Sequence, residues 1–344
     1  MMLPTPLTLN GAPGSPYTRK MVSLLRYRRI PYKLLQFGGM GTPAELPKPK
    51  VQLLPTFYLP NAKGEIEAVV DSSPLIRRLE REFEGRSVLP PHPVTAFIDY
   101  LLEDYADEWL TKAMFHYRWH YAADADKAGD ILPRWSRIAA SDEQMAQMKA
   151  FIKDRQISRL YVVGSSDTTA PVIEASYERF LDLFNAHLKV YPYLMGNRPG
   201  ASDFAMFGQL TALTHFDPTP MALTVKKAPR VYAWVEVTED LSGLEPKESD
   251  WLDPANIPST TIALLREFGR VYVPALIANA KAIASGAETF ETEIDGKSWK
   301  QQTFPYQAKC LQWIRNAYAD LGDKDRATVD KLLAGTGISL LFQK

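Results

Sequence analysis

The stretch Ser15-Pro16-Tyr17-Thr18-Arg19-Lys20 decides the fold, because it joins a predicted strand to a predicted helix. Before it, residues 7–9 (Leu-Thr-Leu) favour a β-strand that ends at the breaker cluster of residues 11–14 (Gly-Ala-Pro-Gly). After it, apolar residues recur at helical spacing as far as residue 27, with basic residues between them. We therefore expect a strand, a loop and a helix, with Ser15 placed to cap the helix.

The alternation of strands and helices continues through roughly the first eighty residues. Residues 32–36 predict a second strand, and residues 55–59 and 66–70 predict an antiparallel hairpin around an Asn-Ala-Lys-Gly turn signal. A helix that begins at Ser72 or Ser73 should follow. The order strand, helix, strand, loop, strand, strand, helix indicates a small α/β domain.

A proline-rich linker, residues 87–93, separates this domain from a helical one. Apolar residues at fourfold spacing predict one long, largely buried helix over residues 97–117. Further helices are expected over residues 141–160, which open with a capping box, and over residues 171–188. The second domain should therefore be mostly helical.

The chain is predicted to contain a first domain over 1–86, a helical domain over 94–250 and a C-terminal extension over 251–344. The extension shows two helical stretches and a hairpin that turns at Asp295-Gly296. Because its apolar residues would otherwise form an exposed patch, we expect the extension to pack on the helical domain.

Composition excludes several classes of protein. The chain has 344 residues, of which 46% are hydrophobic and 23% charged, so disorder and coiled coil are excluded. Its formal net charge is zero, which argues against a nucleic-acid binder or a protein of acidic membranes. The single cysteine, Cys310, excludes an intramolecular disulfide, and its apolar neighbours indicate a buried residue. With neither a leader nor a membrane span in the pattern, we expect a cytoplasmic protein.

Four short motifs, in this order along the chain, together resemble the glutathione S-transferase superfamily. They are Ser15-Pro16-Tyr17, Leu54-Pro55-Thr56, Asp71-Ser72 and Gly196-Asn197-Arg198-Pro199-Gly200-Ala201-Ser202-Asp203. The resemblance implies a thioredoxin-fold N-terminal domain followed by an all-α C-terminal domain. It also implies a detoxifying homodimer that conjugates glutathione to a hydrophobic electrophile, with glutathione as co-substrate and no metal or redox cofactor.

The resemblance makes Ser15 the catalytic residue. A thiol with a pKa of about 8.5 is mostly protonated at neutral pH, so an enzyme that uses thiolate must stabilise the anion. Ser15 can donate its hydroxyl to the sulfur at the N-terminus of a helix, where the dipole also favours an anion. On this hypothesis Ser15 is a hydrogen-bond donor; the alternative is that it only caps the helix.

The same resemblance assigns glutathione to Leu54, Pro55, Asp71, Ser72 and Lys50. A cis bond before Pro55 would let the backbone of Leu54 pair with the ligand as an added strand does. Asp71 would accept from the γ-glutamyl ammonium, while Ser72 and the following helix terminus would bind the carboxylate. A basic residue should contact the glycyl end, and Lys50, or alternatively Lys48, is available for this.

One departure concerns the segment between residues 37 and 53. The family normally has a helix there, whereas this segment is rich in glycine and proline, among them Gly38, Gly39, Gly41 and Pro43. We therefore expect irregular backbone.

The predicted pocket for the electrophile consists of Tyr17, Tyr105, Trp109 and His116, although the aromatic residues of the long helix could equally belong to the core. His116 also belongs to a polar row at fourfold spacing, together with Asp104, Glu108, Lys112 and His120. This row indicates either an exposed ion-paired face or a polar lining of the cleft between the domains. A metal site is not expected, because the two histidines have no third ligand.

A rival hypothesis is a non-catalytic member of the same fold that binds a protein or a small ligand. The irregular segment and the long C-terminal extension favour it. A thiol-disulfide reductase is disfavoured, because Ser15 stands where such an enzyme needs a cysteine.

Overall fold

The computed structural model describes residues 3–37 and 45–343. Its first domain has one four-stranded sheet with the strand order β2-β1-β3-β4. The strands are β1 (Leu7–Gly11), β2 (Tyr32–Gln36), β3 (Thr56–Pro60) and β4 (Ile66–Val69). β1 pairs in parallel with β2 and antiparallel with β3, which pairs antiparallel with β4. A parallel strand–helix–strand unit and an antiparallel hairpin thus form a thioredoxin fold, as predicted.

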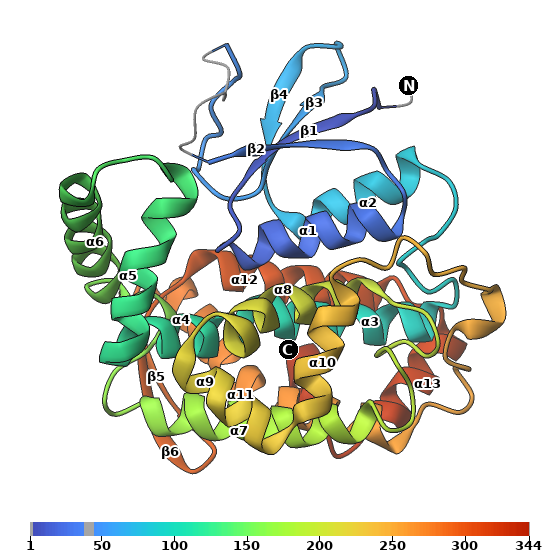
Figure 1. The fold of residues 1–344 in the computed structure, drawn as a ribbon. Helices are drawn as coiled ribbons and strands as arrows, with labels where there is room; N and C mark the ends of the chain where they lie inside the picture. Colours follow the sequence, from blue (N-terminus) through green and yellow to red (C-terminus); the bar gives the residue numbers. More distant parts are fainter. Residues whose placement is uncertain (1–2, 38–44, 344) are drawn as a thin grey trace.

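Two helices, α1 (Pro16–Tyr27) and α2 (Ser72–Glu82), lie on the side of this sheet that faces the rest of the molecule (Figure 1). Residues 45–53 contain no helix or strand. The irregular backbone predicted for residues 37–53 is observed over that part, whereas the predictions for Gly38, Gly39, Gly41 and Pro43 lie outside the described residues.

The second domain is all-α, as predicted. Its long helical rod is made of α3 (Pro93–Tyr105), a π-helical segment (Ala106–Leu110) and α4 (Thr111–His120). The sequence predicted one uninterrupted α-helix there, because apolar spacing does not distinguish a wider π turn from an α turn. The other helices are α5 (Ala122–Ser136), α6 (Asp142–Ile157), α7 (Ala170–His187), α8 (Ala201–His215), α9 (Pro218–Lys227) and α10 (Pro229–Thr238). Ser141 and Gln144 form the predicted capping box of α6.

The helix α8 begins in the last of the four sequence motifs. The Asp203 carboxylate accepts from the backbone N–H groups of Gly200 and Leu194, at 2.9 and 2.8 Å. The hydroxyl of Ser202 donates to Asp99 on α3 at 2.6 Å. Because both carboxylates are fully buried, these bonds fix α8 against α3.

The C-terminal residues fold onto the second domain. They form α11 (Ser259–Ala284), β5 (Thr289–Ile294), β6 (Lys297–Gln302), α12 (Pro305–Ala319) and α13 (Asp323–Leu333). The hairpin turns at Asp295 and Gly296, both of which have positive φ, as the sequence predicted. α11 packs on α7 and α3, and α12 and α13 also contact α3.

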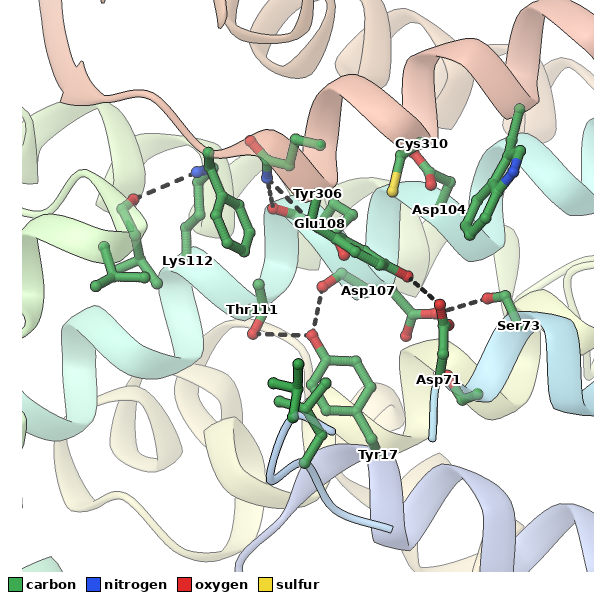
Figure 2. A pocket seen from close by; sticks show the side chains of 18 of the residues that line it. Tyr17, Asp71, Ser73, Asp104, Asp107, Glu108, Thr111, Lys112, Tyr306 and Cys310 are labelled. Carbon is green, nitrogen blue, oxygen red and sulfur yellow. Dashed lines mark hydrogen bonds between the residues drawn. The ribbon is translucent and has the colours of Figure 1, made fainter. Parts of the chain in front are cut away.

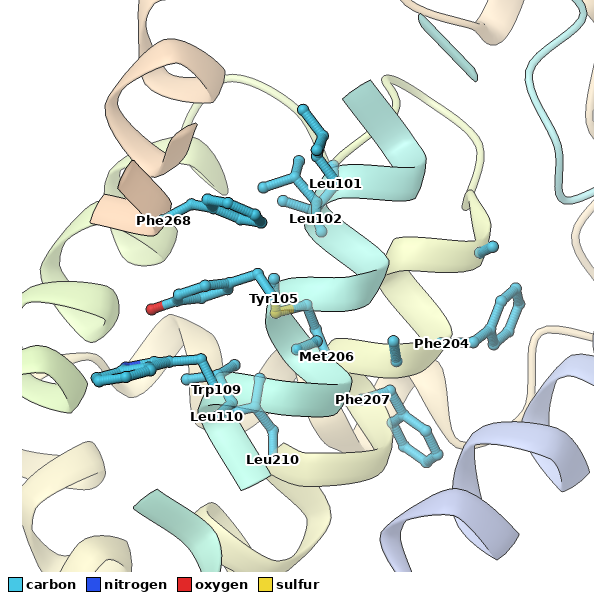
Figure 3. Close-up of a cluster of buried hydrophobic side chains, with 14 of the residues drawn as sticks. Leu101, Leu102, Tyr105, Trp109, Leu110, Phe204, Met206, Phe207, Leu210 and Phe268 are labelled. Carbon is cyan, nitrogen blue, oxygen red and sulfur yellow. The ribbon is translucent and has the colours of Figure 1, made fainter. Parts of the chain in front are cut away.

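The core of the second domain surrounds the α3–α4 rod (Figure 3). The Tyr105 ring lies 5.9 Å from that of Phe268 on α11, and the Trp109 ring lies 5.5 Å from that of Trp299 on β6. The C-terminal residues therefore supply part of this core.

Helix α1 connects the domains by packing closely on α8. A Cβ atom at Gly208 of α8 would lie only 2.4 Å from the carbonyl oxygen of Pro16, so no other residue fits at this contact. Ser23 of α1 adds a 2.6 Å hydrogen bond to the carbonyl of Thr238 on α10. The two domains thus meet through backbone contact as well as side chains.

Candidate functional site

A cavity of about 460 Å³ lies between the two domains (Figure 2). Four parts of the chain contribute to its walls: the first domain, the α3–α4 rod, residues 162–163 before α7, and the start of helix α12. The lining residues are Tyr17, Val51, Leu53, Leu54, Pro55, Asp71, Ser72, Ser73, Tyr100, Asp104, Asp107, Glu108, Thr111, Lys112, Val162, Val163, Phe304, Tyr306, Gln307, Cys310 and Trp313.

The cis peptide bond predicted between Leu54 and Pro55 is present, and both residues line the cavity. Ser15 caps α1 by accepting from the backbone N–H of Thr18 at 3.2 Å. Its hydroxyl lies 3.4 Å from the carbonyl oxygen of Leu54, to which it donates. Ser15 is half-buried beside the cavity wall and is not itself a lining residue.

Asp71 and Ser72 lie at the N-terminus of α2, on the same cavity. The backbone φ of Asp71 is +83°, a conformation that residues other than glycine rarely adopt and that tends to occur at functional sites. Its Oδ2 already accepts a 2.9 Å hydrogen bond from the hydroxyl of Tyr306 on α12. This contact could not be predicted from the sequence, because 235 residues separate the two partners.

Beneath Ser72 is an ion-pair cluster made of Lys20, Arg77, Glu103 and Asp107. The Lys20 ammonium lies 2.8 Å from Glu103 and 2.6 Å from Asp107, and it donates to the hydroxyl of Ser72 at 3.1 Å. Burial lowers the pKa of Lys20, but the two carboxylates outweigh burial and raise it overall. This role of Lys20 could not be predicted from the sequence, because Lys20 resembles the other basic residues on the face of an amphipathic helix.

The two carboxylates of this cluster respond differently to the same lysine. Burial would raise the pKa of Glu103, but Arg77 and Lys20 together lower it. In the described part of the chain, Asp107 pairs with one cation, Lys20, so burial, helped by the nearby carboxylates of Glu103 and Asp71, prevails and its pKa is raised. Glu103 is thus the more firmly ionised partner.

A carboxylate wall made of Asp104, Glu108 and Gln307 lines the cavity further from the first domain. Burial raises the pKa of Asp104 to about 7 and that of Glu108 well above its usual value. The amide of Gln307 donates to Glu108 Oε2 at 3.1 Å. Asp104, Glu108 and also Lys112 were expected on an exposed face or on the cleft, and the structure shows the second alternative.

Lys112 is directed away from these carboxylates (Figure 2). Its ammonium donates to the carbonyl of Val163 at 3.4 Å and to Gln301 Oε1 at 3.2 Å. It also lies within 6 Å of the ring centres of Trp109 and Trp299. Burial lowers its pKa to about 8.

Of the four residues predicted for the electrophile pocket, only Tyr17 lines the cavity. Its hydroxyl donates to the carbonyl of Asp107 at 2.7 Å. The pocket assignment is wrong for Tyr105 and Trp109, which point into the core behind the rod (Figure 3). It is also wrong for His116, which is fully buried between Ser165 and Glu174, at 2.8 and 3.1 Å.

Lys50 and Lys48 are both exposed, and neither lines the cavity. In the described ranges 3–37 and 45–343, no group of three or more potential metal ligands occurs. His116 and His120 stack on each other at 4.6 Å instead. In the same part of the chain, every helix is too short or too polar to cross a membrane.

Two family models match the sequence. The N-terminal domain of glutathione S-transferase matches residues 9–87, and the C-terminal domain of glutathione S-transferase matches residues 156–240. No curated protein matches the chain.

Several solved structures are distantly similar. A Tau class glutathione S-transferase from mango, Mangifera indica, is 18% identical, with 71% of this chain and 94% of that chain covered and a TM-score of 0.42. A glutathione S-transferase from Methylobacterium radiotolerans, in complex with glutathione sulfonate, is 17% identical over 68% and 90% of the two chains, with a TM-score of 0.37. A glutathione transferase family member from Pseudomonas fluorescens, with two glutathione molecules bound, is 14% identical over 67% and 87%, with a TM-score of 0.40.

Proposed function

The chain belongs to the glutathione S-transferase superfamily, and from this membership we propose that it transfers the sulfur of glutathione to an electrophile with an apolar part. The observation that carries the proposal is a single cavity that joins the cis-Pro55 strand and Asp71-Ser72 to the helices of the second domain. A transferase needs both substrates in contact, and such a cavity can hold them together.

Glutathione would lie along Leu54 and reach α2 with its γ-glutamyl group. Leu54 offers backbone groups to an extended peptide, as an edge strand does. The α2 N-terminus favours a carboxylate, and Asp71 offers an acceptor to the ammonium. Lys50 is exposed and lies outside the cavity, so we place the glycyl end of glutathione in solvent.

Ser15 would stabilise the thiolate. Its hydroxyl now donates to Leu54 over a long distance of 3.4 Å, so it can turn to a sulfur placed beside that carbonyl at little cost. The thiol proton leaves to solvent, the thiolate attacks an electrophilic carbon, and a carbon–sulfur bond forms as the leaving group departs. The α1 dipole favours the anion in the same place.

Calorimetric titration of the full chain with glutathione tests the proposal. We expect saturable binding that weakens by tenfold or more in Asp71→Asn, since the ammonium loses its anionic partner. The matched control is Glu67→Gln, an exposed carboxylate on β4, which should bind as the unchanged protein does. Absence of binding, or equal affinity in Asp71→Asn, would refute this site.

The second candidate is a non-catalytic binder with the same fold. It is favoured by the hydroxyl of Tyr306, which occupies the Asp71 oxygen that glutathione would need. Glutathione binding together with turnover of an aryl halide supports the transferase. Binding without turnover by any electrophile supports the second candidate.

We also propose the twofold homodimer that the family resemblance implies. Light scattering on the full chain should give twice the 38.7 kDa mass of one chain. A monomer would refute it.

A further inference from the structure

The carboxylates that line the cavity differ in their partners. Four carboxylates line it, and of these Asp107 forms an ion pair, with Lys20. Asp71, Asp104 and Glu108 form no ion pair with any residue in the described part of the chain. Asp104 and Glu108 are only 6% and 7% exposed, so water compensates them poorly.

Two acceptor atoms on this wall lack a donor. Gln307 is 2% exposed, and within residues 3–37 and 45–343 its Oε1 has no hydrogen-bond partner. In the same part of the chain, Oδ2 of Asp104 has no partner within hydrogen-bond distance either, although the hydroxyl of Tyr272 and the thiol of Cys310 are near enough to lower the pKa of this carboxyl. Buried acceptors without donors are rare in folded proteins, because each forfeits a hydrogen bond to water. These two atoms, both on lining residues, indicate a ligand that brings donors and no acceptor.

Lys112, a cationic residue of the cavity lining, does not supply the missing positive charge to the carboxylate wall. The Lys112 ammonium is held by Val163, Gln301 and the two tryptophan rings described above. It forms no ion pair with Glu108, although the two residues lie one turn apart. The wall therefore stays available for a cation that comes from outside.

Aromatic side chains complete this end of the cavity. Tyr100, Phe304, Tyr306 and Trp313 line it beside the carboxylates. Aromatic rings bury apolar groups and attract cations to their faces. Rings next to unpaired carboxylates form a surface suited to an amphiphilic cation.

Building on the proposed function, we propose that the second substrate is a cationic amphiphile, whose ammonium group binds Asp104, Glu108 and Gln307 and whose apolar body packs on Tyr306 and Trp313. The ammonium supplies up to three donors and the missing positive charge. Glutathione keeps the opposite end of the cavity, at Leu54 and Ser72. The ammonium group does not react; it positions the electrophilic carbon.

The raised pKa values of the two acids on the carboxylate wall agree with this assignment. Burial raises the pKa of Asp104 to about 7 and that of Glu108 well above its usual value, so both groups tend to retain protons where positive charge is missing. A bound ammonium would replace those protons.

Three probes of nearly equal shape test the proposal on the full chain, without glutathione. They are 4-phenylbutylammonium, 4-phenylbutan-1-ol and 4-phenylbutyrate, titrated by calorimetry at pH 7.5. We expect the cation to bind at least tenfold more tightly than the alcohol, and the carboxylate to bind more weakly than the alcohol. Equal affinity for cation and alcohol, or tighter binding of the carboxylate, would overturn the proposal.

Two variants locate the cation. Glu108→Gln and Asp104→Asn each keep the shape of the side chain and remove its charge, so each should reduce the cation preference at least threefold. The control is Glu143→Gln, an exposed carboxylate on α6, which should leave the preference unchanged. A preference retained in both wall variants would overturn the assignment.

The outcome is separable from that of the proposed function, because the probes are measured without glutathione. Cation preference without glutathione binding refutes the transferase and leaves the cation site standing. Glutathione binding without cation preference refutes only the cation site.

Discussion

The ion-pair cluster and the carboxylate wall occupy adjacent positions on the same helical rod and have opposite electrostatics. Glu103 and Asp107 face α1 and share the buried ammonium of Lys20. Asp104 and Glu108, each one position further along, face the cavity without such a partner. The buried carboxylates that join the two domains are therefore neutralised by cations of the protein itself. The buried carboxylates on the cavity are neutralised by a ligand or by a proton.

The largest effect should follow from removing the lysine of the ion-pair cluster. Lys20→Met leaves the buried Asp107 without a cation and Glu103 with Arg77 alone, which should cost about 3 to 5 kcal/mol of unfolding free energy. Lys112→Met is the matched control, because that buried lysine has no carboxylate partner, and we expect about 1 kcal/mol or less. Urea unfolding at pH 7 measures both. Equal losses would break the comparison.

The next effect concerns the thiolate, which we assign to the first domain and not to the carboxylate wall. Ser15→Ala should lower kcat by roughly tenfold to a hundredfold, which corresponds to a charge-assisted hydrogen bond of about 1.5 to 3 kcal/mol. The effect should fall on kcat rather than on glutathione affinity. Ser15→Thr keeps a hydroxyl and should retain more activity, and Ser298→Ala, at an exposed position of β6, should change nothing. Unchanged turnover in Ser15→Ala would reduce Ser15 to a helix cap.

The pH dependence of stability should distinguish the two regions by sign. The pKa of Asp104 is raised to about 7 in the folded protein, against about 4 in an unfolded chain. The folded state therefore holds the extra proton, and the resulting stability is present below pH 4 and is lost as the pH rises through 7. Asp104→Asn should flatten this decline by about 3 kcal/mol between pH 4.5 and 7.5.

Glu103 should behave in the opposite way. Its pKa is lowered, so its stabilisation is present above the unfolded pKa of about 4.3 and is lost as the pH falls through the folded pKa. Asp104→Asn should not change the loss of stability at low pH that Glu103 causes. Urea unfolding measures the free energy of unfolding across this pH range. If that free energy falls as steeply with rising pH in Asp104→Asn as in the unchanged protein, the raised pKa of Asp104 is contradicted.

The smallest effect should come from the contact of the C-terminal residues with the first domain. Tyr306→Phe removes the hydroxyl that donates to Asp71, so glutathione affinity should rise about twofold to tenfold, which corresponds to a net hydrogen-bond contribution of about 0.5 to 1.5 kcal/mol. Tyr161→Phe, at a tyrosine that is 47% exposed, is the control. Lower affinity in Tyr306→Phe would make Tyr306 part of the glutathione site and not its competitor.

The sequence predicted the first domain well because its signals are local. Strand alternation, the turn at residues 61–64 and the cap of α1 depend on neighbours within a few residues. The cis bond at Pro55 was predicted from the family resemblance and is present.

Which side chains of the α3–α4 rod point into the cavity and which point into the core could not be predicted in the same way. First-domain, second-domain and C-terminal elements surround it, so nearly all of its side chains are buried and periodicity gives no exposed side to orient it. Tyr105, Trp109 and His116 were therefore assigned to the cavity although they face the core. Tyr306 and Gln307 reach the cavity from a part of the chain that the family resemblance does not cover.

Gly208 has a consequence for how ligands can enter. Because its missing side chain allows α8 to touch the backbone of α1 directly, the separation of the two domains is set by main-chain contact and cannot shrink further when a substrate arrives. Lys20 packs beside the same glycine, so the backbone contact and the ion-pair cluster hold the two domains together at the same place. The binding free energy of a ligand is then not consumed in closing the domains, and the gap between them works as a preorganised receptacle.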